Sequence, residues 1–297
     1  MHRFLPFGLL PLLAACASSP EPAPEPAPAP VAEEPSAGAE TDETPAEPGP
    51  SAEALLDAAI AGEHRSEDNR ARDAYRHPKE TLLFFGLEPD MTVVELSPSG
   101  GWYSEVLAPV VRERGKLVGA IPSLEGPGAK YAQRFLDRIA KDPEVFEGVE
   151  TVTLEPPEET TLGPEGSADM VLTFRSTHGW VEREQVDDVY EAAYRVLKPG
   201  GVFGVVQHRA DEGADPAETA EDGYVPEAHV IEIAEDAGFE LVESSDINAN
   251  PKDTHDHPEG VWTLPPSLRV DDEEDRAEYE AIGESDRMTL KFRKPAQ

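Results

Sequence analysis

The chain has 297 residues, with 61 acidic side chains against 25 lysines and arginines, and its formal net charge is −36. A charge of this sign opposes binding to phosphate backbones and to anionic lipid surfaces, so we expect no nucleic-acid partner. The single cysteine excludes an intramolecular disulfide and a zinc site built from cysteines. The length allows one or two domains.

The first residues have the features of an export signal. A basic start at 1–3 precedes an apolar run at 4–13 that is too short to span a bilayer as a stable helix. Residues 13–16, Leu-Ala-Ala-Cys, then resemble the bacterial lipobox. We predict a lipoprotein signal peptide at 1–16 and lipidation of Cys16, which would anchor the protein in the cell envelope, on the periplasmic side of the outer membrane. An ordinary cleavage site beside an incidental cysteine is the alternative.

Residues 17–50 contain ten prolines, eight acidic residues and no basic residue. This composition cannot bury enough apolar surface to fold, so it predicts a disordered, Pro/Ala/Glu-rich tether that polyproline segments make semi-rigid. A peptide motif recognised by a partner protein is the alternative. Since the tether carries only −8, residues 51–297 retain a charge of −29 and the domain is itself acidic.

The pattern of residues 51–297 alternates between helices and short apolar strands, which indicates right-handed crossovers and a mostly parallel sheet. Helices are predicted at 51–60, 68–75, 79–85, 101–114, 129–139, 183–197 and 226–237. Strands are predicted at 91–96, 116–121, 149–154, 169–174, 202–207, 239–246 and 288–293. The predicted fold class is therefore α/β, with N-terminal helices and a doubly wound, mostly parallel seven-stranded sheet in one domain.

Ligands of an open parallel sheet bind beyond the carboxyl ends of its strands. The loop after the first predicted strand follows Glu95 and reads Ser-Pro-Ser-Gly-Gly at 97–101. Its glycines leave room for a ligand to approach the backbone, and its end opens a helix whose amide groups favour anionic atoms. Paired glycines after a strand can also form a simple turn. The order and spacing of the other motifs along the chain are needed to distinguish a ligand-binding loop from such a turn.

That order resembles the class I S-adenosylmethionine-dependent methyltransferases. Their parts occur here as Glu95, the loop at 97–101, the strand at 168–172 and the Leu-Lys-Pro-Gly-Gly turn at 197–201. The resemblance covers about residues 70 to 295. Segments that resemble an exported bacterial subgroup of predicted methyltransferases are 76–81, 101–109, 174–180 and 285–287. The resemblance implies a Rossmann-like fold and S-adenosylmethionine as cofactor.

The resemblance also implies roles for individual residues. The implied cofactor-binding residues are Glu95, Ser97, Ser99, Gly100, Gly101, Glu155 and Phe174. Glu95 would accept hydrogen bonds from the cofactor's ammonium group, and Glu155 would approach its adenine. His178 and His208 follow strand ends on the ligand side and are the candidate catalytic bases, which are needed if the acceptor starts protonated. For the two carboxylates a turn cap or a solvated loop residue is the alternative, and for the histidines surface or packing roles.

Two features depart from the family pattern. The second strand runs into Gly-Ala-Ile-Pro-Ser at 119–123, without the acid that usually binds the ribose. Pro98 and Ser99 stand where further glycines are typical. Asp253 and the His-Asp-His segment at 255–257 could ligate a divalent ion, but a polar loop is the preferred interpretation, and we expect no metal centre.

The leading functional hypothesis is a lipid-anchored methyltransferase that acts on an unidentified small-molecule acceptor. The alternative is a non-catalytic envelope lipoprotein that uses a degenerate methyltransferase fold to bind a small molecule or a partner. The alternative is motivated by the cofactor's synthesis in the cytoplasm, away from an exported protein, and by the missing ribose-binding acid.

Overall fold

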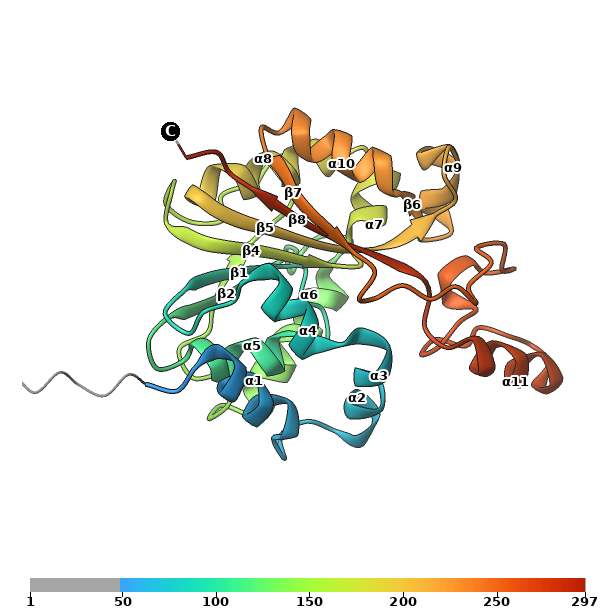
Figure 1. Cartoon of the computed structure of the whole chain (residues 1–297), viewed down its shortest axis with the longest axis horizontal. Coiled ribbons are helices and arrows are strands. Elements are labelled where there is room, and N and C mark those ends of the chain that lie inside the picture. Colours follow the sequence, from blue (N-terminus) through green and yellow to red (C-terminus); the bar gives the residue numbers. More distant parts are fainter. Residues whose placement is uncertain (1–48, 297) are drawn as a thin grey trace, which may run out of the picture. The chain divides into compact units, whose positions relative to one another are not determined.

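One sheet organises residues 49–296, which are the residues that the computed structural model describes, apart from the side chains of 273 and 274 (Figure 1). Its strands are β1 (Thr92–Leu96), β2 (Lys116–Ile121), β3 (Glu150–Thr153), β4 (Ala168–Phe174), β5 (Leu197–Ala210), β6 (Val225–Pro226), β7 (Glu240–Ser245) and β8 (Arg287–Arg293). They are ordered β3-β2-β1-β4-β5-β8-β7, and β6 pairs with the end of β5. Only β8 runs antiparallel to its neighbours. The predicted α/β class with a mostly parallel sheet is confirmed, with the two-residue β6 as an unpredicted eighth strand.

Helices cover both faces of this sheet. They are α1 (Ala52–Ala61), α2 (Glu67–Ala71), α3 (Asp73–Arg76), α4 (Pro78–Phe85), α5 (Ser104–Val111), α6 (Ala129–Lys141), α7 (Thr177–Glu182), α8 (Val186–Val196), α9 (Pro216–Glu221), α10 (Glu227–Asp236), α11 (Glu273–Ile282) and a 3-10 turn at Gly260–Trp262. Figure 1 shows α1, α4 and α5 on one face and α8 and α10 on the other. None of the helices in the described part of the chain combines the length and the apolarity needed to cross a membrane.

The sheet divides the hydrophobic core in two. Successive side chains of a central strand point to opposite faces, so neighbouring residues are buried in different halves of the core. Val93 is buried with Leu56 of α1 and Phe85 of α4. Its neighbour Val94 is buried with Val189 of α8 on the opposite face. A sheet covered on both faces in this way exposes its ends, and the ends are where loops can form a ligand site.

The N-terminal helices begin and end where the sequence supplies the required residue types. Ser51 caps α1 by accepting a hydrogen bond from the backbone N–H of Ala54. The helix predicted at 68–75 is two short helices, α2 and α3. His77 ends α3 in a left-handed conformation (φ 40°), because the following Pro78 disfavours a helical residue before it and itself starts α4.

Other elements differ from the sequence predictions. The strand predicted at 202–207 is the longer β5, which begins at Leu197 and includes the predicted turn at 197–201, because Leu197 already pairs with Ala168 of β4. The helix predicted from 101 begins at Ser104, because Gly101 has φ 72°. The helix predicted from 183 begins at Val186, after Glu184 with φ 55°. The helices α7, α9 and α11 were not predicted. The predicted signal peptide at 1–16 and the predicted tether up to residue 48 lie outside the described residues.

A buried ion-pair cluster attaches the first helices to α5. The Arg65 side chain, fully buried, donates to Glu105 Oε1 at 2.8 Å and pairs with both carboxylate oxygens of Asp73 at 2.7 and 2.8 Å. Glu105, also fully buried, accepts further hydrogen bonds from Asn69 and Arg138. Because a buried charge is costly without partners, removing one member destabilises the others.

We predict that Arg65→Met, which keeps the packing of the side-chain stem and removes the charge, lowers the free energy of unfolding by about 3 kcal/mol. Urea denaturation measures the change. Arg70→Met is the matched control: Arg70 is exposed and its side chain donates a solvent-exposed hydrogen bond to the Gly62 carbonyl, so the change should alter stability little. Equal stability of the two variants would contradict the role given to the cluster.

Candidate functional site

The candidate site lies at the carboxyl edge of the sheet, where the loops after β1, β4 and β5 meet the start of the antiparallel strand β8. The register pairs the end of β5 with the start of β8, since His208 lies opposite Arg287. In the same way Leu96 of β1 lies opposite Thr173 of β4. Loops that leave these strands therefore converge at one edge, as the sequence predicted for a parallel sheet.

The loop after β1 has the backbone of a glycine-rich loop, although two of its three left-handed residues are serines. Ser97, Ser99 and Gly101 have φ values of 50°, 49° and 72°. The N–H of Ser97 donates to the Ala120 carbonyl at 2.8 Å, and the N–H of Gly101 donates to the Pro98 carbonyl at 2.8 Å. A left-handed conformation costs an L-residue about 1–2 kcal/mol. The glycine-like path is thus kept despite the departures in sequence.

Glu95 is buried beneath this loop and bonded to the start of α5. One of its carboxylate oxygens accepts a hydrogen bond from Ser104 Oγ at 2.5 Å. Burial raises the pKa of the Glu95 carboxyl to about 7, and the Ser104 hydroxyl opposes this rise in part. The structure therefore gives Glu95 a contact with its own chain, and the expected contact with an ammonium group remains a prediction.

Three aromatic side chains close the space beside the loop. The Tyr103 and Phe174 rings are stacked, with centroids 3.5 Å apart and planes 8° apart, and Trp102 meets Tyr103 edge-on at 4.7 Å. Trp102 donates its indole N–H to the Asn69 carbonyl, and Tyr103 donates its hydroxyl to the Arg76 carbonyl. The stack links the loop after β1 to the loop after β4, so Phe174 acts here as a packing residue between two elements.

Glu155 lies at the end of β2 although it follows β3 in the chain. Its carboxylate accepts a hydrogen bond from the backbone N–H of Ser123 at 2.8 Å. An added Cβ at Gly126 would be 3.1 Å from Glu155 Oε1, so the carboxylate packs directly against the loop after β2. The second strand lacks an acid of its own, and Glu155 supplies one at that position in space.

His178, in α7 after β4, lies close to His208. Their ring centroids are 5.8 Å apart. His208 was predicted to follow the end of a strand, but β5 continues to Ala210 and contains it, because the residues from Val202 to His208 all pair with β8.

Gln207 Nε2 contacts His178 Nδ1 at 3.4 Å, and Ser285 Oγ contacts His208 Nδ1 at 2.5 Å. Burial lowers the pKa of His178 to about 4 and lowers that of His208 well below its usual value. Both imidazoles are therefore neutral at pH 7. Because an amide nitrogen only donates, His178 Nδ1 is the acceptor of its contact with Gln207, and the lone pair of this imidazole faces Gln207.

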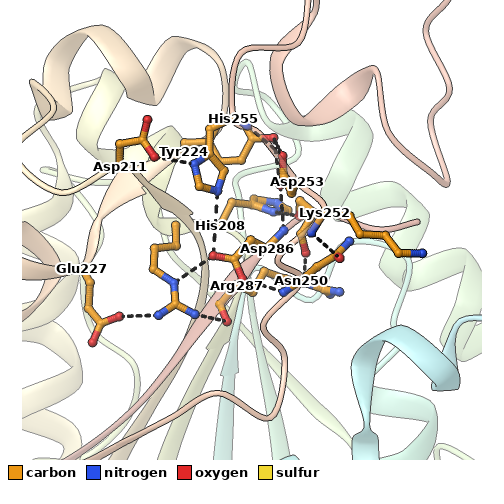
Figure 2. A network of polar contacts seen from close by, with 12 residues as sticks. His208, Asp211, Tyr224, Glu227, Asn250, Lys252, Asp253, His255, Asp286 and Arg287 are labelled. Carbon is orange, nitrogen blue, oxygen red and sulfur yellow. Dashed lines mark hydrogen bonds and ion pairs between the residues drawn. The ribbon is translucent and has the colours of Figure 1, made fainter. Parts of the chain in front are cut away.

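A polar network around Asp253, in the loop at 248–257, lies next to His208, whose ring is 6.3 Å from that of Tyr224 (Figure 2). Asp253 accepts hydrogen bonds from the Tyr224 hydroxyl at 3.0 Å, from His257 Nε2 at 2.9 Å and from the backbone N–H of Asp286. His255 pairs with Asp211 through Nδ1 at 2.9 Å. Within residues 49–296 no group of three or more histidine, cysteine or acidic side chains is arranged to hold a metal ion. The His-Asp-His segment thus forms part of a hydrogen-bonded loop.

Sequence reasoning missed a cluster of arginines beside these groups. Its members are Arg72, Arg76, Arg175 and Arg287, and the carboxylate among them is Glu284. The distances from Glu284 to Arg72 Nε, Arg76 Nε and Arg287 Nη1 are 2.6, 3.0 and 3.1 Å. The sequence did contain one signal for this cluster. Arg175 directly follows a predicted strand at the ligand edge, in a chain where basic residues are few.

Comparison with solved structures agrees with this geometry. A S-adenosylmethionine-dependent methyltransferase from Aquifex aeolicus superposes with a TM-score of 0.52 at 17% identity, over 76% of this chain and 94% of that chain. The [4+2]-cyclase SpnF superposes with a TM-score of 0.53 at 17% identity, over 82% and 92% of the two chains. The chain has the class I methyltransferase fold.

A third similar structure is the geranyl diphosphate C-methyltransferase from Streptomyces coelicolor, solved with Mg²⁺, geranyl diphosphate and S-adenosylhomocysteine. Its TM-score is 0.51 at 14% identity, over 80% of this chain and 87% of that chain. No protein-family model matches the sequence, and no curated protein matches it. At these identities the likeness establishes the class I methyltransferase fold and leaves the reaction to be argued from the site.

The raised pKa of Glu95 predicts a specific pH dependence of stability. A carboxyl whose folded pKa is about 7 instead of 4.5 favours the folded state below pH 4.5, and this contribution is lost as pH rises through 7. Glu95→Gln cannot ionise but can still accept from Ser104. Between pH 5 and 8 the wild type should lose about 2 to 3 kcal/mol of unfolding free energy relative to this variant. Urea denaturation at each pH measures the free energy of unfolding of both proteins. If the two free energies change by the same amount between pH 5 and 8, the raised pKa of Glu95 is refuted.

Proposed function

We propose that the protein is a S-adenosylmethionine-dependent methyltransferase that acts on a small-molecule acceptor. The observation that carries the proposal is the loop after β1, whose residues 97, 99 and 101 keep left-handed backbone conformations and which follows the buried acid Glu95. A side chain added at Gly100 would have one near neighbour, Arg134 Cδ at 3.7 Å from the Cβ, so the loop leaves open space over its backbone. A flat polar ligand can approach such a loop closely.

The residues around the loop fit the polar groups of the cofactor. Glu95 would face the ammonium group, since a buried carboxyl with a pKa near 7 ionises readily beside a cation. Glu155, held at the end of β2, would accept hydrogen bonds from the ribose hydroxyls, which differs from the adenine contact expected from the sequence. Bound there, the cofactor would supply an electrophilic methyl group on a positively charged sulfur.

In methyl transfer, the residues of this chain would place the acceptor atom and accept its proton. Methyl transfer depends mainly on in-line placement of the acceptor atom. The stacked Tyr103 and Phe174 rings give the site a rigid, dry wall. The neutral imidazole of His208 can accept a proton from an acceptor hydroxyl or amine, and His178 can do so once its Nδ1 leaves Gln207. The lowered pKa values make both imidazoles weak bases.

A second candidate is a non-catalytic protein that binds a small molecule through the same fold. Two observations favour it: the Glu95 carboxylate already bonds to Ser104, and β2 ends without an acid. One protein with a similar fold is titled a [4+2]-cyclase, so this fold is not confined to proteins named as methyltransferases. Direct binding of the cofactor separates the two candidates.

We further propose that the protein is exported and anchored in the cell envelope by a lipid on Cys16. The support is the sequence at 1–16 and the Pro/Ala/Glu-rich composition of 17–50, which suit a signal and a spacer. The acidic domain would not adhere to an anionic membrane by electrostatics, so the lipid would provide the attachment.

Calorimetric titration of the full-length chain with S-adenosylmethionine tests the main proposal. We expect saturable binding by the wild type and at least about tenfold weaker binding by Gly100→Val, because the branched side chain fills the space over the loop without a forbidden φ. Gly49→Val is the matched control at an exposed glycine outside the site. Absence of binding to the wild type at millimolar cofactor would leave the second candidate.

Fractionation of bacterial cells that express the full-length chain tests the anchor. Cys16→Ser removes the acceptor sulfur, so the protein should move from the membrane fraction to the soluble fraction. Ser36→Ala, a polar-to-small change within the tether, should leave the distribution unaltered. Retention of the Cys16→Ser protein in membranes would refute lipid anchoring through this residue.

A further inference from the structure

The arginine cluster of Arg72, Arg76, Arg175 and Arg287 carries more positive charge than its surroundings neutralise. Arg72, Arg76 and Arg287 all pair with the single carboxylate of Glu284, whose side chain is 4% exposed. Burial lowers the pKa of Arg175 to about 10, and among the charged neighbours Glu284 raises it while Arg72 and Arg287 lower it. Arg175 is therefore within electrostatic reach of the same carboxylate, and among the described side chains one paired carboxylate faces four cations.

Several guanidinium nitrogens of the cluster are buried without a hydrogen-bond partner. Within the described residues these are Arg72 Nη2, both Nη atoms of Arg76 and Arg175 Nε. Arg76 is 1% exposed and its guanidinium lies 4.7 Å from the centroid of the Trp102 ring, which fixes its orientation. A buried N–H group without an acceptor costs free energy, and a guanidinium costs more than a neutral donor. A hydrogen-bond acceptor atom on a bound ligand would remove this cost.

Arg175 is the member of the cluster that is partly exposed and also affects the two histidines. The residue is partly exposed although its Nε is buried, and its side chain forms no hydrogen bond or ion pair with the described residues. Its backbone is left-handed, with φ 60°, directly after β4. The positive charge of Arg175 also contributes to the lowered pKa of His178 and of His208. An anion bound to Arg175 would therefore lie beside both imidazoles.

We propose that this cluster binds an anionic oxygen group, a carboxylate or a phosphate, of the methyl acceptor. Planar guanidinium groups match such groups through paired N–H···O bonds. Arg72 and Arg175 are partly exposed, and Arg76 and Arg287 are buried behind them, so an anion would enter from one side and be held in place. The assignment to the acceptor rests on the proposed methyltransferase function, whereas the anion site itself does not.

Inorganic phosphate is the probe, titrated into the full-length chain at constant ionic strength and followed by calorimetry and by Tm. We expect saturable binding with a rise in Tm, at least about tenfold weaker binding by Arg175→Gln and partial recovery in Arg175→Lys. Arg195→Gln, at an exposed helical arginine 47% accessible, is the matched control and should bind like the wild type. Equal phosphate affinity of Arg175→Gln and the wild type would overturn the site.

Glu284→Gln gives a test in the opposite direction. Glu284 is the carboxylate shared by the arginines of the cluster among the side chains that the structure describes. Its neutralisation should tighten phosphate binding and enlarge the phosphate-induced rise in Tm, because the ligand then replaces the lost counter-charge. An arginine cluster with a purely structural role would be destabilised by this change without a larger response to phosphate. A response equal to that of the wild type would therefore count against the proposal.

A phosphate titration repeated at saturating S-adenosylmethionine assigns the anion. An unchanged phosphate affinity is expected if the cluster serves the acceptor. Competition between phosphate and cofactor would show that the cluster holds the cofactor's own carboxylate, and would overturn the assignment to the acceptor. Phosphate binding by a protein that binds no cofactor would refute the proposed function and leave the anion site standing, so the two failures are distinguishable.

Discussion

Pairing between buried arginines and carboxylates determines where the N-terminal helices sit on the sheet. Arg65 joins the segment between α1 and α2 to Glu105 of α5. Glu284, three residues before the start of β8, pairs with Arg72 and Arg76 across more than 200 residues of chain. Buried ion pairs contribute little net stability but are costly to break, so they select one arrangement of these elements. Charged contacts consequently hold the loops at the carboxyl edge of the sheet in one arrangement.

The same charges make the edge unlike the rest of the molecular surface. Residues 51–297 carry a formal charge of −29, yet four arginines gather at this edge around Glu284. At physiological salt, repulsion between an anion and distant acidic side chains is screened beyond about 8 Å. Contacts inside the cluster are shorter and partly shielded from solvent, so they are screened less. An acidic exterior would thus slow the approach of an anion without preventing its binding, and added salt would reduce that barrier.

Local patterns in the sequence were sufficient to predict the sheet, but not the contacts that complete the site. Apolar runs such as 92–96 identify strands because burial on both faces requires them. The short acidic helices α9 and α11 lack the apolar periodicity that marks a helix. Glu155 approaches Ser123, and Glu284 approaches Arg72, only after the chain has folded. The signal peptide, the tether and the roles of the site residues remain predictions.

Two residues in strained conformations show how the edge is held in shape. Ser97 follows β1 directly and Arg175 follows β4 directly, with φ values of 50° and 60°. The N–H of each donates to a carbonyl of a neighbouring strand, that of Ala120 in β2 and that of Val206 in β5, at 2.8 and 2.7 Å. The ladder therefore continues one residue past each strand and then forces a left-handed turn. Because β1 and β4 are adjacent, both turns direct their loops to the same space, and a ligand there would not have to order them.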